Sequence, residues 1–320
     1  MPLPPFLRRQ AGVLALLVAS SLPAAPAPVE LRWLGEAPPL LSSGVSWGVP
    51  WPRGAVSRDQ NFQLLAGDGS ALPLQTWPLA YWPDGSLKWS GFATVAGPAV
   101  KSGLRLEPAA SSPAAAGVRV RTTETTLEVS TGRLQCRVLR QGEGLIERLS
   151  VDGREVARAG RLVCLLQQGP DDDATVSLPR ERFVSRLRQV TVEQSGPVRA
   201  VLKLEGVHQG AKGGRNWLPF VVRLYFHAGD PGIRLVHTII FDGDEQRDFI
   251  RGLGLEFEVP LREEIQNRHV RFSGEDDGLW PNPFSRPWAG AARSSRTRRP
   301  EAETCTRTNW PVAGSRMRLN

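Results

Sequence analysis

The sequence has few of the residues that most often build metal and nucleophile sites. Only three of its 320 residues are cysteine and four are histidine, and neither type recurs at the short spacing that zinc ligands require. A phosphate-cradling glycine loop is also absent. We therefore predict no metal centre and no cofactor.

Long apolar runs are scarce as well. After residue 27 no segment is apolar enough to cross a membrane, so we expect no membrane span. The short apolar run 11–22 follows Arg8 and Arg9 and precedes a Pro/Ala-rich stretch, 23–27. A basic start, a short apolar run and small residues are typical of a cleaved secretory signal. We predict that residues 1–27 are a signal peptide and that the protein is secreted or periplasmic.

Excess positive charge is missing from the body of the chain, although the formal net charge is +8. Two arginines lie in the predicted signal, and residues 281–320 hold eight arginines against two glutamates. What remains is thirty basic and thirty acidic residues. A neutral body creates no general attraction for a phosphate backbone, so we expect no nucleic-acid partner.

A helical period is also missing, and strand patterns take its place. The segments 29–34 and 61–65 alternate apolar and polar residues, as half-buried strands do. Tight turns are indicated at 67–70 and at 83–86, where Pro, Asp, Gly and Ser follow one another. Short strands joined by tight turns predict a small β-barrel over 28–116, which ends in a Pro/Ala/Ser-rich linker, 107–117.

A second group of strands predicts a different β domain over 117–280. The runs 198–204, 220–226 and 233–241 alternate over a longer stretch than the strands before them. Turns are indicated at 151–154, 169–173, 194–197 and 228–232. Long antiparallel strands usually stack as two sheets over a shared core. We therefore predict an all-β protein, a barrel followed by an antiparallel sandwich.

The strand pattern stops after Trp280. From residue 281 onward neither a period of two nor one of 3.6 is present, and arginine dominates. Two interpretations fit this change: a disordered basic tail, or a change of reading frame in the coding sequence. In either case we expect 281–320 to be unstructured.

Two smaller features leave alternatives open. Cys136 and Cys164 lie on strand-like runs, where they are either a disulfide or, as the pattern favours, small core residues. The densest acidic run is 242–248. Such oxygen-rich loops can bind calcium, but the EF-hand spacing is absent, so a solvated hairpin loop is the plainer interpretation.

Tryptophan is the abundant residue with chemical interest, because five of the ten lie between positions 47 and 89. Indole faces stack on the apolar faces of sugar rings, or they fill a β core. Arginine can bind the carboxylate of a uronate through its planar set of donors, or it can form a surface ion pair that contributes little stability. The candidate substrate-binding residues are Trp51, Arg53, Trp82, Asp84, Lys88 and Trp89.

Two motifs make the chain resemble a known family. They are Gly-Val-Pro-Trp-Pro-Arg-Gly at 48–54 and Trp-Pro-Asp-Gly-Ser-Leu-Lys-Trp at 82–89. Both resemble the N-terminal RIFT-type barrel of the YetA-like, exo-rhamnogalacturonan lyase family, and the second domain is similar to that family's central β-sandwich. Members that resemble this chain are longer and carry an (α/α) toroid-like domain. The resemblance implies a fragment of a polysaccharide-lyase-like protein, with an acidic plant-type polysaccharide as partner.

The sequence leaves catalysis uncertain. Removing a proton next to a uronate carboxylate requires a cation, a base and an acid. Arg53, Tyr81, Lys88, Tyr225 and His237 are chemically eligible, but the sequence brings no such set together, and the resemblance assigns no catalytic residue here. We therefore expect β domains that support or bind pectin-type glycan and are inactive in isolation. The alternative is a non-catalytic carbohydrate-binding or cell-surface module.

Overall fold

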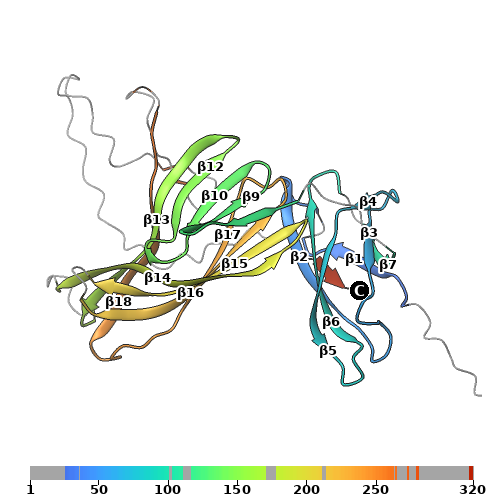
Figure 1. The fold of residues 1–320 in the computed structure, drawn as a ribbon, viewed down its shortest axis with the longest axis horizontal. Helices are drawn as coiled ribbons and strands as arrows, with labels where there is room; N and C mark the ends of the chain where they lie inside the picture. The colour runs from blue at the N-terminus through green and yellow to red at the C-terminus, as the bar shows by residue number, and fades with distance from the viewer. Residues whose placement is uncertain are drawn as a thin grey trace, which may run out of the picture.

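The computed structural model contains only β-strands and connections within the part of the chain that it describes (Figure 1). The described residues are 26–35, 37–100, 103–110, 117–170, 178–210, 214–262, 264, 272–273, 279–280 and 317–319. The all-β prediction is confirmed. Most of the predicted signal peptide, residues 111–116 of the predicted linker and most of the predicted tail lie outside the described residues.

The N-terminal domain is a small barrel made of two sheets. One has the order β21-β1-β7-β3-β4, and the other has the order β2-β6-β5. Its strands are β1 (Val29–Trp33), β2 (Ser43–Pro50), β3 (Phe62–Leu65), β4 (Ala71–Leu72), β5 (Gln75–Tyr81), β6 (Leu87–Ala96) and β7 (Leu104–Pro108), with β21 (Met317–Leu319) added at one edge.

Alternation along these strands places one face in the barrel core. Val45, Phe62, Phe92 and Leu106 are almost wholly buried there, and Phe62 and Phe92 meet edge to face with ring centres 5.3 Å apart. The opposite face of β2, β6 and β5 points away from the barrel. This outer face later carries part of the candidate site.

The predicted turn between β5 and β6 is present. Gly85 has a φ of 85°, which strongly favours glycine. The Asp84 carboxylate accepts hydrogen bonds from the backbone N–H (3.0 Å) and the hydroxyl of Ser86. This side-chain arrangement stabilises the turn locally. The residues Pro-Asp-Gly-Ser are therefore accounted for by the turn that they form.

The second domain is a sandwich with the main strand order β17-β16-β15-β14-β13-β12-β10-β9-β8. Its strands are β8 (Arg119–Thr122), β9 (Thr126–Ser130), β10 (Leu134–Leu139), β11 (Gly142–Glu143), β12 (Ile146–Val151), β13 (Arg154–Gln168), β14 (Arg180–Ser195), β15 (Arg199–Gly210), β16 (Asn216–His227), β17 (Arg234–Ile239) and β18 (Asp248–Glu258). A separate pair follows, β19 (Phe272–Ser273) with β20 (Leu279–Trp280).

One long strand belongs to both layers of the sandwich. The first half of β13 pairs with β12, and its second half pairs with β14, while β18 lies along its other edge. Ala159, at the change of partner, has a φ of 51°. The chain therefore turns from one sheet into the other without a break in β13.

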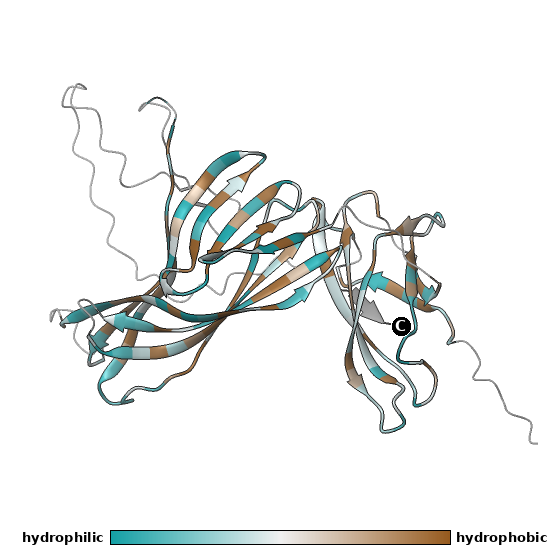
Figure 2. Ribbon diagram, viewed as in Figure 1, coloured by the Kyte–Doolittle hydropathy of each residue, from teal (hydrophilic) through white to brown (hydrophobic). Residues whose placement is uncertain are grey.

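The sandwich core lies between these two layers. Leu127 on β9 and Val138 on β10 pack with Leu202 on β15 and Leu224 on β16. Figure 2 shows hydrophobic and hydrophilic residues alternating along these strands, as expected when one face of each sheet is buried. The predicted two-layer sandwich is confirmed.

Cys136 and Cys164 are both buried free thiols, in agreement with the core interpretation. Burial raises the pKa of the Cys164 thiol to about 11 and raises that of Cys136 further. No helix long and apolar enough to span a membrane occurs among the described residues.

Of the arginine-rich tail, 281–320, the structure describes three residues, 317–319. Met317–Leu319 forms β21, which pairs antiparallel with β1. These three residues are an exception to the unstructured tail that the sequence predicts. A free edge of β1 presents unpaired N–H and C=O groups, which explains why a short extended segment adds there.

Candidate functional site

The two domains meet where the ends of β15 and β16 approach β2 and β5 (Figure 1). The outer face of the barrel sheet and the outer face of the sandwich sheet adjoin at this point. Aromatic side chains of the barrel lie there beside aromatic and cationic side chains of the sandwich. We call the following set the junction surface: Trp77 on β5, Trp89 on β6, Arg199 on β15, Tyr225 on β16 and Arg234 on β17.

Gln75 fixes the barrel to the sandwich at this junction. Its side-chain oxygen accepts hydrogen bonds from the backbone N–H groups of Val198 (3.1 Å) and Arg199 (2.7 Å). Both groups are at the start of β15, where the strand ladder with β16 begins. The position of Arg199 relative to the barrel is therefore set by backbone contacts as well as by its own side chain.

Glycines allow the two tryptophans to lie close to the barrel sheet. A Cβ on Gly91 would come within 2.2 Å of the Trp77 ring, and one on Gly48 within 2.3 Å of the Trp89 indole nitrogen. Trp77 and Gly91 are direct cross-strand neighbours. Trp89 is 42% exposed, so part of its indole surface is open to a ligand.

Arg199 is the most enclosed charged group of the junction surface. It is 7% exposed, and its guanidinium carbon lies 4.1 Å from the Trp77 ring centre. Its Nε and Nη2 donate to Gln194 Oε1 (3.0 and 2.6 Å), and Nη1 donates to Ser46 Oγ (2.8 Å). Burial lowers the pKa of Arg199 to about 10, because removal from water disfavours the cation.

Tyr225 lies next to two cations. The guanidinium carbons of Arg199 and Arg234 are each 5.6 Å from its ring centre, within the range of cation–π attraction. In the described part of the chain, neither arginine forms an ion pair. Two other cations on this outer face are paired: Arg223 with Glu193 (2.8 Å) and Lys203 with Glu205 (3.0 Å).

The structure separates the six residues that the sequence suggests as substrate-binding. Trp51 is 6% exposed, stacks on Phe62 and donates its indole N–H to Ser90. A sugar ring cannot reach an indole packed in this way. The sequence does not distinguish Trp51 from Trp89, yet only Trp89 lies on the outer face.

Four of the six gather at the β5–β6 hairpin. Lys88 Nζ lies 4.6 Å from the Trp82 ring centre, and Arg53 pairs with Asp84 at 3.0 Å. Hydrogen bonds from Ser86 are the main cause that lowers the pKa of Asp84 to about 2, and Arg53 adds to the effect. Because the Arg53–Asp84 pair is exposed, it contributes little stability.

Sequence reasoning did not place Trp77, Arg199 or Arg234 in a site, and it considered Tyr225 only as a chemically eligible side chain. Arg199 gives one signal that could have been used. It stands between the apolar residues Val198 and Ala200 at the start of a strand, and a charged residue buried among apolar neighbours requires a partner. That partner comes from the other domain, which alternation within a strand does not reveal.

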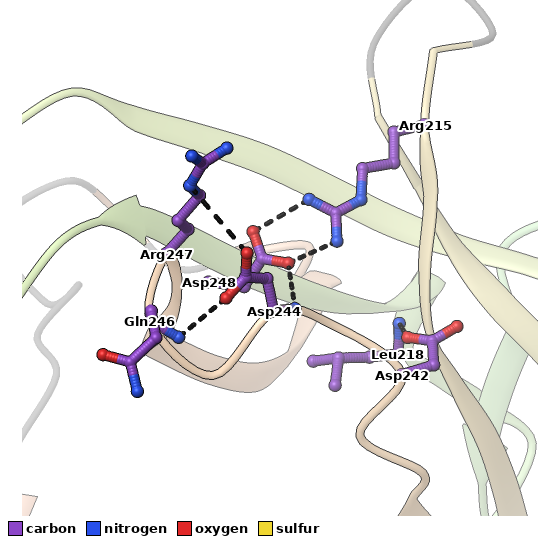
Figure 3. A network of polar contacts seen from close by, with 7 residues as sticks. All are labelled: Arg215, Leu218, Asp242, Asp244, Gln246, Arg247 and Asp248. Atoms are coloured by element: carbon purple, nitrogen blue, oxygen red, sulfur yellow. Dashed lines mark hydrogen bonds and ion pairs between the residues drawn. The ribbon is translucent and has the colours of Figure 1, made fainter.

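Carboxylates of the acidic run 242–248 are already engaged in hydrogen bonds within the protein (Figure 3). Asp248 makes two hydrogen bonds with Arg215 (2.8 and 2.5 Å) and accepts one from the Asp244 N–H (2.9 Å). Asp242 accepts from the Leu218 N–H (2.8 Å). Arg215 is the main cause that lowers the pKa of Asp248. Nowhere in the described ranges do three or more His, Cys, Asp or Glu residues form a group that could hold a metal ion.

Three histidines are largely enclosed. His208 and His237 have ring centres 6.0 Å apart, and His227 is 7% exposed at the domain junction. Burial lowers the pKa of His227 and of His237 to about 4, so both rings are neutral at pH 7. Their Nε2 atoms have no hydrogen-bond partner among the residues described.

Both domains match known families. Residues 27–109 match the family described as "PcRGLX-like N-terminal RIFT barrel domain", and residues 118–304 match "PcRGLX-like protein central beta sandwich domain". The second match continues past Trp280 into the arginine-rich segment. The two matched ranges follow the two domains seen in the structure.

Two individual proteins are also similar. The Bacillus subtilis protein YetA, described as uncharacterized, is 37% identical over 254 residues, which cover 79% of this chain and 29% of YetA. This chain thus spans less than a third of that relative. A protein in glycosyl hydrolase family 38 from Enterococcus faecalis aligns over 66% of this chain and 31% of its own, with 8% identity and a TM-score of 0.41. At that TM-score the likeness establishes neither fold nor function.

The sandwich match covers more than half of the residues, and the barrel match covers most of those that precede it. The motifs at 48–54 and 82–89 fall within the barrel match. The chain belongs to the PcRGLX-like family, a group related to rhamnogalacturonan lyases.

Proposed function

We propose that the two β domains bind an acidic plant-type polysaccharide of the pectin type, as part of an exported polysaccharide-lyase-like protein. The proposal rests on the junction surface, where aromatic rings from both domains lie with two arginines of the sandwich that form no ion pair among the described residues. Export is supported by the basic and apolar start of the sequence.

The chemistry of the junction surface suits a charged sugar polymer. Trp89 offers partly exposed indole surface, on which the apolar face of a sugar ring can stack. Arg199 and Arg234 offer guanidinium N–H groups that bind carboxylates through directional hydrogen bonds. Because the surface extends over two domains, it can contact more than one sugar of a chain.

We further propose that these domains contribute binding rather than cleavage. Elimination at a uronate requires a base near the transferred proton as well as a neutralising cation. Tyr225 and His237, two of the chemically eligible side chains, lie on opposite faces of their sheet: Tyr225 on the outer face, and His237 against the core residue Phe220. The junction surface therefore unites cations and rings without an evident acid–base pair.

The test is a binding titration of the whole chain with polygalacturonate and with rhamnogalacturonan, followed by tryptophan fluorescence and calorimetry. Trp89→Ala should weaken binding by about tenfold, because stacking of one ring contributes on the order of 1 kcal/mol or more. Leu79→Ala is the matched control, since Leu79 is exposed on β5. Absence of binding at millimolar sugar would reject the proposal, and an unsaturated uronide formed by the chain alone would show that it also cleaves.

A further inference from the structure

We propose that the junction surface contains a dedicated site for the carboxylate of a uronate residue, formed by Arg199 and Arg234 beside Tyr225. This inference rests on the proposed glycan-binding function and names the group of the sugar that these domains recognise. Binding at such a site would require the carboxylate of the sugar, whereas a general glycan-binding surface would need only the sugar rings.

The charge of Arg199 has no counter-charge among the described residues. A guanidinium as enclosed as that of Arg199 normally has a carboxylate partner, because an uncompensated buried charge is costly. Here the acceptors are neutral, the side chains of Gln194 and Ser46. The ring of Trp77 covers the guanidinium on one side. A bound carboxylate would supply the missing negative charge.

Arg199 also keeps hydrogen-bond donors for a ligand. An arginine has five N–H groups, and the hydrogen bonds of Arg199 to Gln194 and Ser46 use three of them, one each on Nε, Nη1 and Nη2. One N–H therefore remains on each terminal nitrogen without a partner among the described residues. A carboxylate has two oxygens that can accept from both.

Arg199 and Arg234 differ from neighbouring cations of the sandwich sheet. Arg223 and Lys203 lie on the same outer face, but each is paired with a glutamate. Arg199 and Arg234 form no ion pair among the described residues, and both lie beside the ring of Tyr225. His227, the cross-strand neighbour of Arg199, is neutral at pH 7, so it does not repel or attract an anion by charge. Two guanidinium charges without an ion pair thus lie beside one ring.

The experiment compares polygalacturonate with the same polymer after its carboxyl groups have been reduced to alcohols, using the whole chain. The wild-type protein should prefer the carboxylated polymer by about tenfold or more, since hydrogen bonds to a charged group are the stronger ones. Arg234→Ala and Arg199→Gln should each remove most of this preference, because they weaken binding of the carboxylated polymer more than binding of the reduced one. Arg119→Ala, an exposed arginine on β8, is the control and should keep the preference.

The outcomes are distinct. Equal binding of both polymers by the wild-type protein would overturn the carboxylate site while leaving the glycan-binding function intact, and no binding of either polymer would overturn both. A sulfated glycan that binds as strongly as polygalacturonate would show unspecific attraction of polyanions and also overturn the site. Because Arg234 is exposed, its replacement keeps the test decisive even if Arg199→Gln disturbs the junction.

Discussion

Gly91 offers a way to disturb the junction surface from beneath. The Cβ of Gly91→Ala would lie 2.2 Å from the Trp77 ring, whereas ordinary contact begins at 3.4 Å. The indole would therefore have to move by about 1 Å, against the steep repulsive part of the contact potential. Trp77 is not free to move, because Arg199 lies 4.1 Å from its ring centre.

The size of the effect follows from these contacts. Overpacking of this kind costs about 1–3 kcal/mol of unfolding free energy, and loss of the Trp77–Arg199 contact removes about 0.5–2 kcal/mol of cation–π attraction. We therefore expect Gly91→Ala to lower the free energy of unfolding by about 2 kcal/mol and to weaken glycan binding in parallel.

Chemical denaturation and the binding titration measure the two consequences. Gly254→Ala is the matched control, because Gly254 also lies in a strand but has no positive φ and no atom within 4 Å of the position that a Cβ would occupy. This variant should be neutral or slightly stabilising. If Gly91→Ala matched the wild-type protein in both assays, the packing of Trp77 under Arg199 would be refuted.

Three further predictions concern residues outside the carboxylate site. Trp51→Ala should cost about 3–5 kcal/mol of stability because it empties part of the barrel core; a stable variant with weakened glycan binding would instead make Trp51 a ligand contact. In the folded chain the pKa values of His227 and His237 are lowered to about 4, whereas a histidine in the unfolded chain has its ordinary pKa of about 6.5. Between these two values the unfolded chain binds more protons than the folded one. The free energy of unfolding should therefore fall as the pH is lowered from about 6.5 to about 4. Replacing either ring by phenylalanine should reduce that slope, and an unchanged slope in both variants would contradict the assigned burial. Asp248→Ala should cost about 2 kcal/mol by leaving Arg215 and the Asp244 N–H without their partner. Since the pKa of Asp248 is lowered in the folded state, the ionised carboxylate stabilises the fold at neutral pH, and this stabilisation is lost as the pH falls through that pKa. Thermal unfolding of the wild-type protein and the variant at several pH values measures the difference.

Much of the fold could be predicted because each strand carries its own signal. The alternation at 198–204 and 220–226 corresponds to β15 and β16, and the turn at 83–86 is where proline, aspartate and glycine place it. These signals depend on period-two burial and on local backbone preferences. The partner change within β13 gave no such signal, because the break in alternation at Arg158 and Ala159 spans only two residues of a strand that is otherwise continuous.

The candidate site was predictable only in part, because most of its members depend on contacts between domains. Trp89 was recognised by residue type, but Trp51 has the same type and lies in the core. Arg199 acquires its environment from Trp77 and Ser46, more than 100 positions earlier in the chain. No local pattern encodes a contact of that kind.

The most direct test is a crystal structure of the chain with a galacturonate-containing oligosaccharide. We predict that the sugar lies on the outer faces of β6, β15 and β16, with a carboxylate within hydrogen-bond distance of Arg199. A sugar bound instead only at the β5–β6 hairpin, or with its carboxylate directed away from both Arg199 and Arg234, would contradict it.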